Sequence, residues 1–175
     1  MRILSIVSLA ALCSLATAQP VQGPTAPPAA PKVKPTRIDF AIPLKPIKQK
    51  DLSFEMLKNR WSLLMYFSPT CGHCQHTYPY IRADRDKYEK RGLAVAAIAT
   101  GFASPDDITA FDKEFNLDVM AFQDDTKKFS EVYGTGSVPL ILLVAPNGTY
   151  QTWNASDSAT IASIDTAIKK ALKIK

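Results

Sequence analysis

The chain of 175 residues is poor in the residues that form disulfide frameworks and zinc sites, with three cysteines and two histidines. A disulfide-rich scaffold uses several bridges in a much shorter chain, and a structural zinc site usually needs four ligands. Cys13 lies in a segment that we expect to be removed, which leaves Cys71 and Cys74, with only His73 and His76 nearby. A redox pair is therefore the preferred interpretation, while a metal site or an inert structural pair stays open.

The folded part of the chain also lacks a basic patch interleaved with aromatic side chains. The formal net charge is +5, but residues 51–175 hold fourteen basic and fifteen acidic residues, whereas residues 19–50 hold six basic residues and one acidic residue. The excess positive charge therefore belongs to the N-terminal region, which could contact an anionic membrane surface weakly. Nucleic-acid binding is not indicated.

Residues 1–18 have the pattern of a signal peptide. Arg2 provides a basic start, residues 3–15 form an apolar core too short for a comfortable membrane span, and residues 16–18 are a small-x-small cleavage site. The chain ends in Lys-Ile-Lys instead of an endoplasmic-reticulum retention signal. We therefore expect export to a bacterial periplasm. Secretion, the endoplasmic-reticulum lumen and membrane anchoring by an uncleaved signal are the alternatives.

A proline-rich basic linker follows the signal. Residues 19–36 contain six prolines and no acid, so they cannot bury a core and should form an extended spacer. We place the linker at residues 19–49 and one folded domain at residues 50–175, a size that suits a single domain.

Within this domain, apolar runs alternate with amphipathic segments. Ser104 followed by Pro105 and two acids is a strong helix start, and the Pro-Asn-Gly at 146–148 is a hairpin signal. The predicted strands are residues 61–68, 93–100, 119–123, 140–145 and 149–154. The predicted helices are residues 53–60, 71–91, 104–115, 126–133 and 160–173. This order predicts an α/β fold with a central mixed sheet flanked by helices.

Cys71 and Cys74 lie directly after a predicted buried strand, at the start of a predicted helix. Unpaired N–H groups and the helix dipole stabilise a thiolate at such a position, and the thiolate is the reactive form. A cysteine three residues on lies on the same helical face and can close a disulfide or resolve a mixed one. His73 between them supplies partial or full positive charge beside the thiolate.

With these features in place, residues 50–173 resemble the thioredoxin superfamily, and within it the periplasmic thiol–disulfide interchange (TlpA-like) branch. The resemblance rests on CGHC after a buried strand, Pro79 five residues after the second cysteine, and the segment 133–143, Tyr-Gly-Thr-Gly-Ser-Val-Pro-Leu-Ile-Leu-Leu. It implies a thioredoxin-like fold and a cis-Pro139 facing the disulfide. It also implies that Val138 offers backbone hydrogen bonds to an extended substrate.

Two positions depart from this family. Thioredoxin has a buried acid where this chain has Met65, and the periplasmic cytochrome-maturation reductases have a glutamate where it has Thr77. Such an acid helps to deprotonate the second cysteine during release of the mixed disulfide. His76 could take that proton if it faces the site, but as a helix residue it is more often solvated or packed.

The sequence thus predicts an exported thiol–disulfide oxidoreductase that acts on protein substrates through Cys71 and Cys74, as a monomer, with a redox partner protein and no cofactor or metal. Its direction, reducing or oxidising, stays open. The alternatives are a thiol peroxidase that uses Cys71 alone, which would need an arginine near the motif, and a non-catalytic thioredoxin-like binding module.

Overall fold

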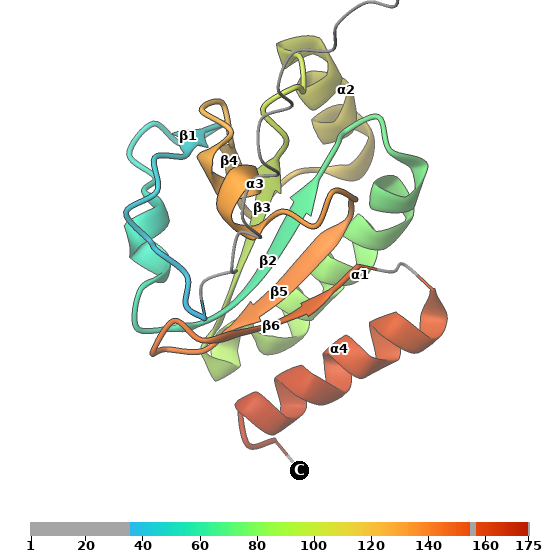
Figure 1. Ribbon diagram of the computed structural model, residues 1–175. Coiled ribbons are helices and arrows are strands. Elements are labelled where there is room, and N and C mark those ends of the chain that lie inside the picture. The colour runs from blue at the N-terminus through green and yellow to red at the C-terminus, as the bar shows by residue number, and fades with distance from the viewer. Residues whose placement is uncertain (1–35, 155–156, 175) are drawn as a thin grey trace, which may run out of the picture. The chain divides into compact units, whose positions relative to one another are not determined.

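The computed structural model describes residues 36–154 and 157–174, which belong to one compact unit. The predicted signal peptide lies outside the described residues. Six strands form one sheet in the order β1-β4-β3-β2-β5-β6 (Figure 1). β2, β3 and β4 run parallel to one another, whereas the pairs β1–β4, β2–β5 and β5–β6 are antiparallel. The strands are β1 (Lys45–Pro46), β2 (Trp61–Phe67), β3 (Leu93–Ala99), β4 (Met120–Gln123), β5 (Leu140–Val144) and β6 (Tyr150–Trp153).

The helices begin and end within a few residues of their predicted bounds. They are α1 (Gly72–Tyr88), α2 (Pro105–Phe115), α3 (Lys128–Tyr133) and α4 (Ser158–Ala171), with short 3-10 helices at Phe54–Leu57 and Glu89–Arg91. The predicted start of α2 is confirmed by a capping box. The Ser104 hydroxyl accepts the Asp107 N–H at 3.1 Å, and the Asp107 carboxylate accepts the Ser104 N–H at 3.3 Å.

Both faces of the sheet are covered, so β2 is buried on both sides (Figure 1). Alternate residues of a strand point to opposite faces. Met65 and Phe67 pack with residues of α1, α2 and α4 in one core cluster, whereas Leu64 and Tyr66 pack with α3 and the first 3-10 helix in another. This confirms the predicted mixed sheet with helices on both sides.

The packed chain starts earlier than residue 50. Residues 36–49, which the sequence analysis placed in the linker, include β1 and four buried apolar side chains, Ile38, Phe40, Ile42 and Leu44. These side chains join the core cluster on the α3 side of the sheet. Their burial replaces exposure of apolar surface to water, which is why this proline-containing segment folds against the domain.

The carboxyl ends of the central strands set the position of the site. β2 and β3 are paired in register, with Phe67 opposite Ala99, and the Thr100 N–H donates to the Phe67 carbonyl at 2.8 Å. The segments that follow both strands therefore leave the sheet side by side. In open α/β sheets this edge is where ligands bind.

Candidate active site

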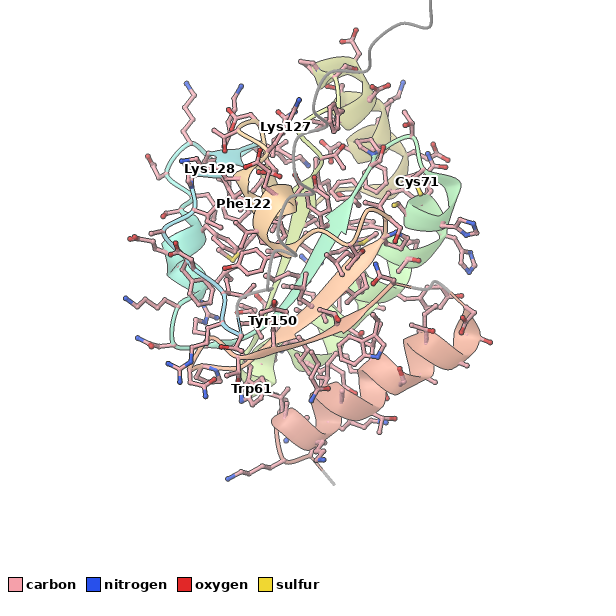
Figure 2. The ribbon with its side chains drawn as sticks, viewed as in Figure 1. Trp61, Cys71, Phe122, Lys127, Lys128 and Tyr150 are labelled. Atoms are coloured by element: carbon pink, nitrogen blue, oxygen red, sulfur yellow. The ribbon has the colours of Figure 1, made fainter. Side chains whose placement is uncertain are left out.

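Cys71 is the N-cap residue of α1 (Figure 2). Its backbone is extended, and its sulfur accepts a hydrogen bond from the Cys74 N–H at 3.4 Å. The Cys71 N–H itself donates to the Ser68 carbonyl at 3.1 Å, and the Gln75 side chain donates to the Pro69 carbonyl at 2.8 Å. These bonds hold the loop between β2 and α1, so that the partly exposed Cys71 sulfur lies at the positive end of the helix.

Cys74 lies one turn further along α1 and is fully buried in the core cluster that contains Met65 and Tyr78. Both cysteines are free thiols. Burial, followed by the neighbouring Cys71, raises the pKa of the Cys74 thiol. The pair is therefore asymmetric, with an accessible sulfur at the helix end and a protonated one beneath it.

The segment before β5 lies beside the Cys71 sulfur, although it is distant in sequence. The Cys71 thiol donates to the Val138 carbonyl at 3.8 Å, across 67 positions of sequence. The Val138–Pro139 peptide bond is cis, as the resemblance implied. Val138 is half-buried and Pro139 is buried. Three of the predicted site residues, Cys71, Val138 and Pro139, thus come together in space.

A bend at residues 136–138 contains Val138 and leads into β5. Gly134 follows α3, and a Cβ atom at Gly134 would lie 2.3 Å from the Ser130 carbonyl oxygen, so any larger residue would displace the chain. The Asn154 side chain then donates to the Thr135 hydroxyl at 2.5 Å and to the Ser137 hydroxyl at 3.3 Å. The segment before Val138 is therefore held by close packing at Gly134 and by hydrogen bonds to Thr135 and Ser137.

The two histidines lie on the exposed side of α1. His73 is exposed in the first turn of α1 and lies between the two cysteines in sequence. His76 is exposed and its ring lies edge-on to that of Tyr80, with centroids 5.7 Å apart. His76 and Tyr80 line a groove between α1 and α4 that contains neither cysteine. His76 thus points away from buried Cys74, as residues two apart on a helix do.

Met65 and Thr77, the two positions that depart from the resemblance, are both fully buried. Met65 packs in the same core cluster as Cys74. Thr77 is fully buried, and its hydroxyl donates to the His73 carbonyl at 2.8 Å. The Thr77 contact was not foreseen from the sequence, because threonine in a helix can bond backwards or point away.

Phe102 is a second feature of this edge that the sequence analysis missed. It follows β3, its side chain is 79% exposed, and the Lys127 ammonium lies 4.2 Å from its ring centroid. Single exposed apolar side chains are common on protein surfaces, so this exposure alone does not indicate a binding site. A Gly-Phe-Ala segment directly after a buried strand was the available signal.

Within residues 36–154 and 157–174, no group of three or more histidine, cysteine, aspartate or glutamate side chains could hold a metal ion. In the same part of the chain, none of the helices combines the length and apolar character needed to cross a membrane.

Solved structures share this fold. A Chlorobium tepidum protein provisionally named thiol:disulfide interchange protein DsbE aligns with a TM-score of 0.72 and 18% identity, over 80% of this chain and 99% of that one. A secreted Mycobacterium tuberculosis disulfide oxidoreductase homologous to E. coli DsbE aligns with a TM-score of 0.61 and 18% identity, over 71% and 93%. A Bacteroides sp. thiol:disulfide interchange protein aligns with a TM-score of 0.63 and 19% identity, over 75% and 86%.

At these identities the similarity establishes the fold, which is the thioredoxin-like fold predicted from the motifs. A search of curated proteins finds no match. A model of the AhpC/TSA family matches residues 34–152, a segment that spans more than half of the chain and includes Cys71, Cys74 and Pro139. The chain therefore belongs to the AhpC/TSA family.

Proposed function

We propose that the chain is a thiol–disulfide oxidoreductase that exchanges disulfides with protein substrates through Cys71 and Cys74. One observation carries the proposal: an accessible sulfur caps α1, while the partner sulfur is buried one turn below it. A nucleophile needs access and a stabilised thiolate, and a resolving thiol needs only to reach the mixed disulfide. The similar solved proteins that are named thiol:disulfide interchange proteins support the same activity.

In the reducing direction, the Cys71 thiolate attacks one sulfur of a substrate disulfide. The substrate S–S bond breaks, a bond between Cys71 and the substrate forms, and the other substrate sulfur leaves as a thiolate that takes up a proton. Cys74 then loses its proton and attacks the Cys71 sulfur, which releases the second substrate thiolate. One substrate disulfide becomes two thiols, and the Cys71–Cys74 dithiol becomes a disulfide. The oxidising direction is the reverse.

The proton on Cys74 is the difficult part of this sequence. Burial raises the pKa of this thiol, and Met65 and Thr77, the two positions at which the resemblance implies an acid, carry no carboxylate. The first substrate thiolate leaves at the same site, and it is a base that can accept this proton. We therefore propose that substrate sulfur takes over the role of the missing carboxylate, and we assign no proton transfer to His76.

Trapping tests the roles of the two cysteines. Cys74→Ser should accumulate a covalent complex with a disulfide-containing protein such as insulin, seen on non-reducing gels and released by dithiothreitol, because the mixed disulfide cannot be resolved. Cys71→Ser is the matched control and should trap nothing. Trapping by Cys71→Ser alone, or by neither variant, overturns the assignment.

The reduction potential in glutathione buffers decides the direction. A value of about −180 to −120 mV would place the protein with isomerases and oxidases, and would indicate that His73 and the helix end favour the thiolate. A value near or below about −250 mV would make it a reductase that needs an electron-supplying partner protein.

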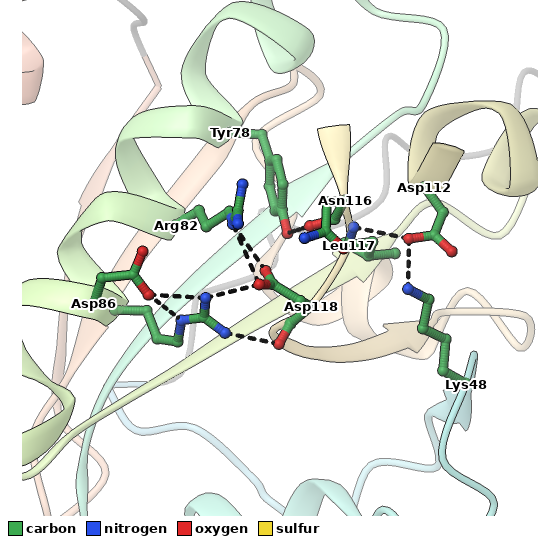
Figure 3. Close-up of polar contacts among 9 residues, drawn as sticks. Lys48, Tyr78, Arg82, Asp86, Asp112, Asn116, Leu117 and Asp118 are labelled. Atoms are coloured by element: carbon green, nitrogen blue, oxygen red, sulfur yellow. Dashed lines mark hydrogen bonds and ion pairs between the residues drawn. The ribbon is translucent and has the colours of Figure 1, made fainter. Parts of the chain in front are cut away.

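A thiol peroxidase is the second candidate, because the AhpC/TSA family match also allows it. Peroxide reduction at Cys71 would need a nearby arginine, and the first one after the motif is Arg82. Its guanidinium pairs at 3.0 Å with the carboxylate of Asp118, which lies in the loop before β4 (Figure 3). This engagement favours disulfide exchange. Peroxide consumption that persists in Cys74→Ser would favour the peroxidase instead.

Two further points remain proposals. We propose export to the periplasm after removal of residues 1–18, which mass spectrometry of the mature protein from a bacterial expression host would test. We also propose that the protein acts on polypeptides as a monomer, with Val138 and Pro139 lining the substrate position. A variant with both cysteines replaced by serine that keeps full biological activity would instead indicate a binding module.

A further inference from the structure

Thr77 is a fully buried polar residue that the mechanism above does not use. Its hydroxyl donates to the His73 carbonyl at 2.8 Å. The peptide group that contains this carbonyl also contains the Cys74 N–H, which donates to the Cys71 sulfur at 3.4 Å. A single peptide plane therefore links the Thr77 hydroxyl to the reactive sulfur.

We propose that Thr77 is a positioning residue that stabilises the Cys71 thiolate through the His73–Cys74 peptide. This inference rests on the proposed function and extends it to the control of the redox potential. Resonance couples the C=O and N–H groups of a peptide, so a donor on the oxygen makes the N–H a stronger donor. A stronger donor favours the charged form of the sulfur that it contacts.

The surroundings of Thr77 strengthen this coupling. The Thr77 side chain is fully buried, and its hydrogen bond to the carbonyl of the exposed His73 is partly buried; a hydrogen bond with reduced access to water is electrostatically stronger than one in water. Residues 71–79 contain no Asp, Glu, Lys or Arg. Besides any charge on His73, backbone and hydroxyl dipoles are therefore the main source of the field that this segment can apply to the Cys71 sulfur.

Thr77 stands where the cytochrome-maturation reductases have a glutamate, and its action differs in kind. A carboxylate would exchange a proton with Cys74. The Thr77 hydroxyl is engaged with a carbonyl and acts on the other cysteine. The expected consequence is a more stable thiolate in the reduced form, and hence a more readily reduced disulfide.

The test compares Thr77→Val, which removes the hydroxyl at similar volume, with Thr77→Ser, which keeps it. Two readouts are the reduction potential in glutathione buffers and the midpoint pH of the 240 nm thiolate absorbance. Chains of hydrogen bonds strengthen one another by roughly 10–30% per bond, so the expected effect is modest. We expect Thr77→Val to lower the equilibrium constant for reduction of the disulfide about two- to threefold, which makes the reduction potential about 9–14 mV more negative. The midpoint pH of the thiolate absorbance should rise by about 0.3–0.5 pH units.

Thr166 provides a matched control, because its hydroxyl makes the same backward bond, to the Ala162 carbonyl at 2.9 Å, on an exposed face of α4. Thr166→Val should leave both readouts at the wild-type values, and Thr77→Ser should restore them. A structural role alone would lower thermal stability without moving the potential. If Thr77→Val folds poorly, Thr77→Ala removes the same hydroxyl and should shift both readouts in the same direction.

The outcomes separate this inference from the proposed function. Wild-type potential and midpoint in both Thr77→Val and Thr77→Ala, or an equal shift in Thr166→Val, would overturn the role of Thr77 while leaving disulfide exchange intact. A wild-type protein that forms no Cys71–Cys74 disulfide and gives no trapped complex would overturn the proposed function, and the inference with it.

Discussion

The two halves of α1 stabilise charge in different ways. In the first turns, residues 71–77, the Cys74 N–H donates to the reactive Cys71 sulfur, and the Thr77 hydroxyl donates to the His73 carbonyl of the same peptide group. The second half uses ion pairs. The Arg85 guanidinium contacts the Asp118 carboxylate at 2.8 Å, and the Asp165 carboxylate of α4 accepts from the Lys87 ammonium and the Tyr88 hydroxyl, both at 2.6 Å. Pro79 lies between the two halves.

This division has a chemical reason. A thiolate that must attack and be released needs stabilisation that does not neutralise it, and dipoles provide that. Carboxylates that hold α1 against α4 and against the loop before β4 gain from full opposite charges. We therefore expect substitutions in the first half to change redox chemistry, and substitutions in the second half to change the dependence of stability on pH.

The largest effect is expected at the reactive sulfur. Cys71→Ser should slow disulfide exchange with insulin by about a thousandfold or more, because no other accessible thiol is present among the described residues. Its free energy of unfolding should change little, because the side chain is partly exposed. Turnover and urea unfolding measured on the same preparation check both statements. A large loss of stability would mean that Cys71 is mainly structural.

Much of this fold could be predicted from sequence, because β2 and β3 are largely apolar runs, with Ser62 the one polar residue, and helix-start signals follow them. The site was predictable for a different reason. Cys71 and Pro139 lie far apart in sequence, and no local pattern brings them together. Their proximity followed from the resemblance of the two motifs to one family, and the 3.8 Å contact between the Cys71 sulfur and the Val138 carbonyl agrees with it.

Three features could not be predicted, each for a physical reason. Ile38, Phe40, Ile42 and Leu44 alternate like strand residues, but prolines and lysines around them masked the pattern, and their burial depends on tertiary contacts. The place of His76 in a groove against α4 depends on how α1 and α4 pack together, although its direction away from Cys74 follows from helical spacing. The Thr77 hydroxyl has alternative rotamers, and only burial against the core selects the backward bond.

The next largest effect is expected at Asp165 of α4, which pairs with the second half of α1. Partial burial opposes its charge, but hydrogen bonds from Lys169, Lys87 and Tyr88 outweigh burial and hold the pKa of this carboxyl below its usual range. The folded state therefore gains stability above pH of about 4, and loses it as the pH falls through the lowered folded pKa. Asp165→Asn should reduce the free energy of unfolding by about 1–2 kcal/mol at pH 7.

Urea unfolding at pH 7 and pH 3 checks this prediction, and the difference between variant and wild type should shrink at the lower pH. Asp86→Asn is the control, because Asp86 pairs with Arg85 but is 61% exposed, so its loss should cost little at either pH. Equal losses for Asp165→Asn at both pH values would contradict the ion-pair account. The reduction potential should not change in either variant.

The smallest effect, with the opposite sign, is expected at Asp84. Burial, followed by the Asp165 carboxylate, raises the pKa of Asp84 to about 6, although Lys87 opposes this. Between pH of about 4 and about 6, the Asp84 carboxyl is protonated in the folded state and ionised in the unfolded chain. The free energy of unfolding therefore falls as the pH rises through that window. Asp84→Asn should raise the free energy of unfolding by about 1 kcal/mol at pH 8 and should leave it unchanged at pH 4.

A double-mutant cycle makes the test of Asp84 sharper. Because Asp165 contributes to the raised pKa, the gain from Asp84→Asn at pH 8 should be smaller in an Asp165→Asn background. Asp84 lies ten residues after Cys74, about 15 Å along the helix and beyond the Debye length of about 8 Å at physiological salt. Its removal should therefore leave the reduction potential unchanged. A shift as large as that expected for Thr77→Val would mean that the two halves of α1 act as one electrostatic unit.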